Sequence, residues 1–245
     1  MQPKVMSHPP ALNFHATHWK HKKSSQSHWH ALETSFEQGQ SFLDTLKAWQ
    51  ADSAAPSQLF FTAFTPEAPS KIAPELSNQC FGLLPGVHRI SLEQGQVQLT
   101  LCIGPAPQIS KEILVAADSI CVDVMENWGA KNLARCCKLG SQVKWLSCPT
   151  TAESELKSLG FELNIQSKTG RYWPQWTSKK LDQAVQSPSV IIIGAGLAGS
   201  AVAHSLAHRA WSVEVIDQGQ ALGAGASGLP AGIFGDRQSE PSLLS

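Results

Sequence analysis

A glycine pattern near the end of the chain most constrains its fold. A β-branched run over 189–193 leads into Gly194-x-Gly196-x-x-Gly199, and a helical pattern and a second strand follow, with Asp217 placed 18 residues after the last glycine. The glycines permit a tight turn, close approach of a pyrophosphate and close helix–strand packing, while the helix N-terminus attracts phosphates. The acid can accept hydrogen bonds from a ribose. The pattern predicts a dinucleotide-binding βαβ unit; a glycine-rich turn in an ordinary βαβ unit is the alternative.

Length and composition restrict the remaining possibilities. A chain of 245 residues with 42% hydrophobic residues can form one or two domains with a core. Its net charge is zero, so no overall field favours nucleic acid or a membrane. The six cysteines have neither a zinc-finger spacing nor the density of a disulfide-rich secreted domain. With no signal peptide or long apolar segment in the sequence, we expect a cytoplasmic protein without a membrane partner.

Helix and strand patterns alternate through the middle of the chain, which predicts an α/β domain over 31–177. Apolar residues from Phe42 to Trp49 lie on one helical face. Strands are expected at 58–64, 97–103, 119–124, 142–146 and 161–165, and further helices at about 127–138 and 151–159. Gly140 and Gly160 are expected to follow the ends of those two helices.

The other segments differ in composition from this domain. Residues 1–30 have no sustained period and are expected to be irregular, and the polar segment 178–188 is expected to be a linker. Residues 189–245 would then form the front part of a nucleotide-binding domain. Only 28 residues follow Asp217, too few for the further strands of a doubly wound sheet, so we expect this domain to be incomplete.

Several segments, taken in order, carry a family resemblance. Residues 33–43, ETSFEQGQSFL, are similar to E-T-G-F-G-T-G-L-N-F-L of the bifunctional tRNA wobble-uridine modification enzymes, the 5-methylaminomethyl-2-thiouridine biosynthesis (MnmC) family. Residues 83–89, LLPGVHR, are similar to that family's L-L-P-G-C-H-R, and 118–123, DSICVD, to its D-A-W-F-L-D. Residues 223–228, GAGASG, resemble the G-A-S-G that lies against FAD in related flavoproteins.

The resemblance implies a fold and an activity. The family joins an S-adenosylmethionine-dependent methyltransferase domain to an FAD-dependent oxidoreductase domain. We therefore expect an α/β fold, with a degenerate methyltransferase-like Rossmann-type domain followed by the first βαβ unit of an FAD-binding Rossmann domain. The implied reaction is oxidative removal of the carboxymethyl group from 5-carboxymethylaminomethyl-(2-thio)uridine in tRNA, with the flavin accepting a hydride. The implied cofactor-binding residues are Gly194, Ala195, Gly196, Leu197, Ala198, Gly199, Asp217 and Ser227. No catalytic residue is assigned.

Departures from the family concentrate where the methyl donor would bind. Ser35 and Glu37 replace two glycines of the loop, and a side chain at each position obstructs close approach of the backbone to a ligand. Thr65 and Pro105 stand where the family has acids, and the family's substrate loop after Asp123 is replaced by a shorter, unrelated segment. The sequence therefore predicts that S-adenosylmethionine is not bound and that the methyltransferase half is inactive.

One segment is unusually basic. Residues 131–180 hold nine lysines and arginines against three glutamates, and Tyr172, Trp173 and Trp176 lie among the last of them. Basic groups that contact phosphates and rings that stack on bases would suit tRNA as a partner. A solvated face with core tryptophans is the alternative, and both interpretations stay open at this point.

Histidines gather near the start of the chain. His15, His18 and His21 are spaced by three residues, and His28 and His30 follow. They lack a defined helix and any cysteine or acid at ligand spacing, so we expect a solvated segment and no metal site.

Two other functions are compatible with the glycine pattern. The first is an FAD-dependent small-molecule amine or amino-acid oxidase, which would not need a methyltransferase-like domain. The second is a non-catalytic, truncated tRNA-binding remnant, which the small number of residues after Asp217 favours.

Overall fold

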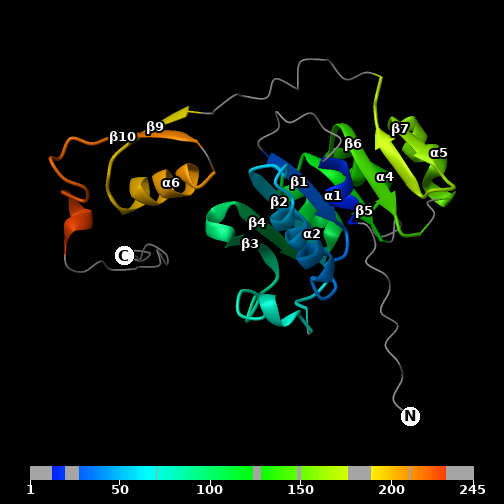
Figure 1. Cartoon of the computed structure of the whole chain (residues 1–245), viewed down its shortest axis with the longest axis horizontal. Helices are drawn as coiled ribbons and strands as arrows, with labels where there is room; N and C mark the ends of the chain where they lie inside the picture. The colour runs from blue at the N-terminus through cyan, green and yellow to red at the C-terminus, as the bar shows by residue number, and fades with distance from the viewer. Residues whose placement is uncertain are drawn as a thin grey trace, which may run out of the picture. The chain divides into compact units, whose positions relative to one another are not determined.

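The computed structural model describes residues 13–19, 28–69, 71–123, 128–147, 150–175, 189–209 and 211–229. The chain divides into two compact units, Met1–Ala184 and Val185–Ser245, and each is considered by itself (Figure 1). The expected linker at 178–188 lies outside the described residues.

The first unit is built on an eight-stranded sheet in the order β3-β4-β2-β1-β5-β6-β8-β7 (Figure 1). Its strands are β1 His28–Glu33, β2 Gln58–Thr65, β3 Gly86–Leu92, β4 Val97–Ile103, β5 Ala117–Val122, β6 Cys137–Trp145, β7 Phe161–Asn164 and β8 Thr169–Tyr172. The five central strands, from β4 to β6, are parallel, and antiparallel strands border them on both sides. The strand order reverses between β1 and β5, and ligands of open α/β sheets bind at the carboxyl ends of the strands at such a point.

Helices cover both faces of this sheet. They are α1 Phe14–Trp19, α2 Gln40–Ala51, α3 Ala106–Glu112, α4 Ala130–Cys136 and α5 Glu153–Ser158, with short 3-10 turns at Pro74–Leu76, Glu93–Gly95 and Thr150–Ala152. Side chains alternate along β2, so Phe61 joins an apolar cluster with Phe42 of α2, whereas Phe64 joins a second cluster with Ile109 of α3 and Leu133 of α4. The unit therefore has three layers, with a core on each side of the sheet.

Most of the regular elements of this unit follow the sequence patterns, but one boundary was predicted wrongly. The helix expected over 127–138 ends at Cys136, because the chain enters β6 at Cys137 without a loop. Gly140, expected to follow that helix, lies inside β6 with φ +87°, beside a shift in the register between β5 and β6. Gly160 does follow α5, with φ +90°.

The expectation that residues 1–30 are irregular is wrong for two stretches. Phe14–Trp19 form α1, and His28 begins β1. Helix α1 has only six residues, too few to show a sustained helical period, and its contacts with the sheet and α2 hold it in place. The Trp19 indole donates a hydrogen bond to Asp52 Oδ2 at 3.0 Å. The other domain boundaries stay predictions.

A buried carboxylate joins the three strands at the reversal of the sheet. Asp118 of β5 lies 2.5 Å from the ammonium of Lys138 on β6 and accepts a hydrogen bond from the backbone N–H of His30 on β1. Asp118 is 2% exposed, so its buried charge depends on such partners, which link β5 to β6 and β1.

The second unit contains β9 Ser189–Ile193, α6 Leu197–Ala207, β10 Ser212–Ile216 and a 3-10 turn at Ala226–Gly228. Strands β9 and β10 are parallel and in register, with Ser189 opposite Ser212, so the segment is a βαβ unit (Figure 1). The predicted α/β class with Rossmann-type units is confirmed. Ile191, Ile193 and Ile216 of this small sheet are exposed, although the faces of parallel sheets are usually covered.

Two further features concern the whole described part of the chain. Its cysteines, Cys80, Cys102, Cys121, Cys136 and Cys137, are free thiols. Within the same residues, no helix has the length and apolar character needed to cross a lipid bilayer.

Candidate dinucleotide-binding site

The turn between β9 and α6 contains three glycines, and two of them, Gly194 and Gly199, have a backbone that other residues do not fit. Gly194 adopts φ +103°, and its N–H donates to the carbonyl of Ile216 at 2.7 Å, which joins the turn to β10. A Cβ on Gly199 would lie 1.8 Å from the carbonyl oxygen of Gly194, and a Cβ on Gly196 would lie 2.9 Å from Ser227 Oγ. The backbone of this turn is therefore bare, as close approach of a ligand's phosphates requires.

Helix α6 begins at this turn. Leu197, Ala198 and Gly199 form the first turn of the helix, where backbone N–H groups have no acceptor within the helix and carry a partial positive charge. The Leu197 N–H donates to Ser227 Oγ at 3.0 Å, so the later loop brings a hydroxyl to the same place. N–H groups and a hydroxyl at a helix N-terminus are suited to bind a phosphate.

Asp217 lies directly after β10 and fixes the turn from the other side. Its Oδ2 accepts a hydrogen bond from the N–H of Ala195 at 2.5 Å, and its Oδ1 accepts one from the N–H of Gly219 at 2.6 Å. These two hydrogen bonds, of which the one from Ala195 has the larger effect, hold the pKa of the Asp217 carboxyl below its usual value. The ionised carboxylate has further lone pairs with which to accept ribose hydroxyls.

The eight residues predicted to bind the cofactor thus gather around one turn. Sequence reasoning missed the role of Asp217 in holding Ala195, and also missed Gly219. The Gly219 N–H donates to Asp217 Oδ1 in an Asp-x-Gly turn, a spacing that could have indicated this glycine. Gly223, which begins the GAGASG segment, donates its N–H to the carbonyl of Ala195 at 3.0 Å and so joins that segment to the turn. A bare turn, an open helix end and an ionised acid fit a dinucleotide such as FAD.

The loop that would hold a methyl donor in the family follows β1 in the first unit. Phe36 is buried, and a Cβ on Gly39 would lie 2.9 Å from its ring and 2.8 Å from Leu76. Thr65 ends β2 where the family has an acid, and its hydroxyl donates to the carbonyl of Glu67 at 2.7 Å. Pro105 precedes the first residue of α3.

Glu37 of this loop has φ +47°, a conformation that favours glycine, which the family has at this position. We predict that Glu37→Gly stabilises the first unit by about 0.5–1 kcal/mol, since relief of the left-handed strain outweighs the added freedom of the unfolded chain. Urea denaturation measures the change. Glu67→Gly is the matched control, because Glu67 is also exposed but has no positive φ, and it should destabilise the unit. An unchanged or lower stability for Glu37→Gly would contradict the prediction.

The fold and the turn define a class: an α/β protein in which a dinucleotide-binding βαβ unit follows a larger Rossmann-type unit. Residues 189–243 match the family described as FAD dependent oxidoreductase. This match supports FAD as the dinucleotide of the second unit.

Comparison with curated proteins extends the relationship to most of the chain. The chain is 38% identical to the tRNA 5-methylaminomethyl-2-thiouridine biosynthesis bifunctional protein MnmC of Polaromonas naphthalenivorans (strain CJ2), over 91% of this chain and 40% of that protein. It is 36% identical to the protein of the same name from Acidovorax sp. (strain JS42), over 90% of this chain and 40% of that protein. The resemblance to this family is confirmed, and the chain spans about two fifths of the length of these relatives.

One solved structure is also similar. The crystal structure of MNMC2 from Aquifex aeolicus shares 18% sequence identity with the chain, with a TM-score of 0.48 over 65% of this chain and 57% of that one.

Proposed function

We propose that the chain acts in tRNA wobble-uridine modification as an FAD-dependent oxidoreductase. The observation that carries the proposal is the bare turn at Gly194–Gly199, with Asp217 and Ser227 around it, in a chain related to proteins named for 5-methylaminomethyl-2-thiouridine biosynthesis. The proposed reaction is oxidative removal of the carboxymethyl group from 5-carboxymethylaminomethyl-(2-thio)uridine. A tRNA substrate of this kind would place the activity in the cytoplasm.

The residues of the turn would bind and orient the cofactor. FAD, when bound, supplies the hydride acceptor for the reaction. The N–H groups that begin α6, together with the Ser227 hydroxyl, would hold the pyrophosphate. Asp217 would hold the adenosine ribose while it keeps Ala195 in place. The proposal assigns these residues to binding and none of them to the chemical step.

Nucleoside analysis tests this function directly. The purified 245-residue chain is incubated with FAD and with tRNA that carries 5-carboxymethylaminomethyl-2-thiouridine, and the tRNA is digested for mass spectrometry. We expect a flavin spectrum on the protein and loss of the carboxymethyl group from the nucleoside. A chain that binds no flavin, or binds it and leaves the nucleoside unchanged, would overturn the proposal. Hydrogen peroxide released from sarcosine or glycine without tRNA would instead identify a small-molecule oxidase.

We propose in addition that the first unit has no methyltransferase activity. Ser35 and Glu37 stand where the family has glycines, Glu37 places a negative side chain in the loop after β1, and the Thr65 hydroxyl bonds locally at the end of β2. A methyl donor with a charged amino-acid moiety and a ribose lacks its expected partners at these positions. Calorimetric titration with S-adenosylmethionine should therefore give no binding heat, and saturable binding would refute this part of the proposal.

The first unit also offers a surface suited to tRNA. The guanidinium of Arg171 on β8 lies 3.8 Å from the centre of the Trp173 ring, and both side chains are exposed. The Lys168 ammonium, in the turn before β8, is exposed and donates to the carbonyl of Leu146. An exposed aromatic ring with cations beside it can stack on a base and contact phosphates. Trp176, expected to contribute, lies outside the described residues.

Substitutions at this surface should weaken tRNA binding. We expect Trp173→Ala to reduce affinity about 5- to 100-fold through loss of stacking, and Arg171→Ala to lower both the affinity and the salt dependence. Filter binding with tRNA at several salt concentrations measures both effects. Lys157→Ala is the control, since that lysine already pairs with Glu153 on α5. Equal affinity for all three variants and the unaltered chain would remove this surface from the proposal.

A further inference from the structure

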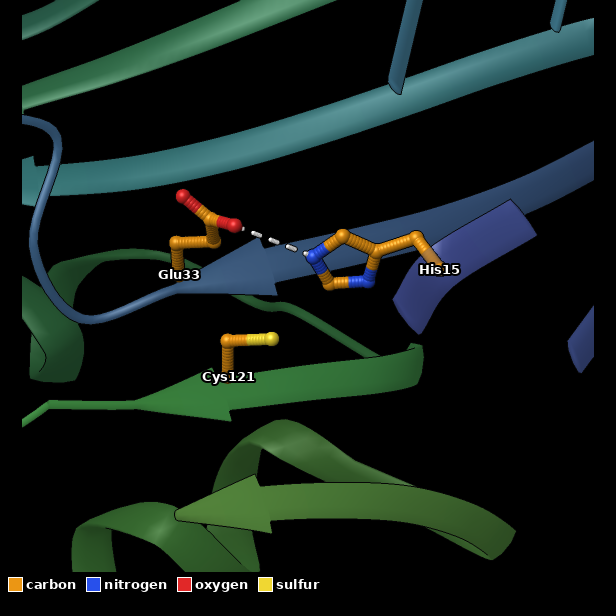
Figure 2. Close-up of side chains that lie close together, drawn as sticks. All are labelled: His15, Glu33 and Cys121. Atoms are coloured by element: carbon orange, nitrogen blue, oxygen red, sulfur yellow. Dashed lines mark hydrogen bonds and ion pairs between the residues drawn. The ribbon is translucent and has the colours of Figure 1, made fainter. Parts of the chain in front are cut away.

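Three side chains with metal-binding atoms meet inside the first unit, far from the dinucleotide turn in sequence. They are His15 of α1, Glu33 at the end of β1 and Cys121 near the end of β5 (Figure 2). Glu33 and Cys121 face each other in the register of the two strands, at the reversal of the sheet. The imidazole nitrogen, carboxylate oxygen and sulfur that they offer lie within 4.8 Å of one another.

The imidazole is held in a defined orientation. His15 Nδ1 lies 2.7 Å from Ser119 Oγ, and that hydroxyl accepts a further hydrogen bond from the Trp29 indole at 2.9 Å. His15 Nε2 therefore points toward Glu33, whose Oε1 lies 3.2 Å away (Figure 2). Histidines that bind metals usually have their second nitrogen fixed in this way.

The surroundings of these atoms favour a positive charge. His15 is 1% exposed and Glu33 is 7% exposed, so the carboxylate needs a compensating partner. The Ser41 hydroxyl donates to Glu33 Oε1, which satisfies the oxygen but not its charge. A cation bound between Glu33 Oε1 and His15 Nε2, which lie 3.2 Å apart, would compensate this buried charge.

The distances are close to those of a metal site. Zinc bonds of about 2.0–2.3 Å in tetrahedral geometry separate neighbouring ligand atoms by roughly 3.3–3.8 Å. The 3.2 Å between His15 Nε2 and Glu33 Oε1 already approaches this value. Because Cys121 Sγ lies within 4.8 Å of both atoms, its side chain would have to move by at most about 1 Å to reach such a separation. A set of nitrogen, oxygen and sulfur ligands suits zinc and excludes magnesium and calcium, which prefer oxygen.

We propose that His15, Glu33 and Cys121 bind one zinc ion. Three protein ligands leave the fourth tetrahedral position to water or another small ligand. The ion would join α1 to β1 and β5 at the point of the sheet where Rossmann-type units bind their ligands. Sequence analysis predicts no metal here because the three ligands come from separate segments of the chain, and only the docking of α1 brings them together. The proposal is independent of flavin binding by the second unit.

Cobalt substitution of the unaltered chain tests this proposal. The full chain is freed of metal and titrated with Co²⁺, and its absorption spectrum is recorded. We expect one equivalent to produce a sulfur-to-cobalt charge-transfer band with visible bands of a four-coordinate site, and one equivalent of Zn²⁺ to abolish both. Histidines elsewhere near the N-terminus could bind Co²⁺ but would not produce the sulfur band. A titration that saturates without that band, or produces no spectrum, would overturn the proposal.

Two variants test whether Cys121 supplies the sulfur ligand and His15 the nitrogen ligand. Cys121→Ser should remove the charge-transfer band, and His15→Gln should weaken Co²⁺ binding at least tenfold. Cys137→Ser is the matched control, since Cys137 is also half-buried and its thiol donates to the carbonyl of Leu133. Should the first two variants fail to fold, alkylation of the unaltered chain decides: Zn²⁺ must protect Cys121 and leave Cys137 unprotected. Retention of the sulfur band in folded Cys121→Ser, or equal alkylation of Cys121 with and without Zn²⁺, would refute the assignment.

Discussion

Gly199→Ala is expected to abolish FAD binding and to unfold the βαβ unit of the second domain. A single methyl group at this position would lie 1.8 Å from the Gly194 oxygen and 2.9 Å from the Gly194 carbonyl carbon, so the helix cannot keep its place against the strand. The backbone has to move by more than an ångström, at a cost on the order of 3 kcal/mol or more. Loss of flavin absorbance on the purified variant measures the binding, and hydrogen exchange over 189–216 measures the unfolding.

The control for this variant lies in the same unit. Val202 is exposed on the same helix α6, so Val202→Ala should keep both flavin and protection from exchange. A Gly199→Ala chain that binds FAD with unchanged affinity would show that the turn does not have the geometry described here. If hydrogen exchange is unchanged but flavin is lost, the added methyl group disturbs only the contact with the ligand and not the fold of the unit.

The sequence predicts the elements that local patterns determine. The expected strand at 58–64 is β2, the expected strand at 97–103 is β4 of a hairpin, and Gly160 follows α5. These succeed because alternation and turn glycines act within a few residues. The end of α4 was missed because no turn residue separates Cys136 from Cys137, and the direct entry into β6 depends on pairing with β5.

Long-range contacts account for what the sequence could not predict. Helix α1 has six residues, and its burial depends on β5 and α2, so no window of sequence could indicate it. Burial of His15 depends on that docking, which explains why a histidine predicted to be solvated is instead 1% exposed beside Glu33. In contrast, the glycine turn was predictable from the sequence. Close packing and a positive φ favour glycine at particular positions of such a turn, and these positions have a fixed spacing.

The loop at 33–39 has a glycine-like backbone conformation at a position that does not hold glycine. Glu37 keeps a glycine-like φ of +47°, and Gly39 keeps φ +82° beside Phe36. Neighbouring β1 and α2 fix the path of the chain at both ends of this loop.

Asp217→Ala is expected to lower FAD affinity by about 10- to 100-fold, the effect of losing hydrogen bonds to a charged group. Two causes contribute: the ribose loses its acceptor, and the N–H groups of Ala195 and Gly219 lose theirs, which loosens the turn. Asp217→Asn keeps one acceptor oxygen and should fall between the alanine variant and the unaltered chain. Quenching of FAD fluorescence measures the three affinities. Glu214→Ala, which removes an exposed acid from the same strand, is the control and should change little.

The dependence of stability on pH tests whether the charge of the Asp217 carboxylate, rather than the size of the side chain, stabilises the turn. Because the bonds from Ala195 and Gly219 lower the pKa of the folded carboxyl, its contribution is fully present above the unfolded value of about 3.9 and is lost as pH falls through the lower folded value. The difference in stability between the unaltered chain and Asp217→Asn should therefore be constant from about pH 5 to 8 and shrink only below about pH 4. A difference that already declines between pH 5 and 7 would mean that the carboxylate is not held by these two amides. In that case its part in the turn, and the ribose contact that depends on it, would have to be abandoned.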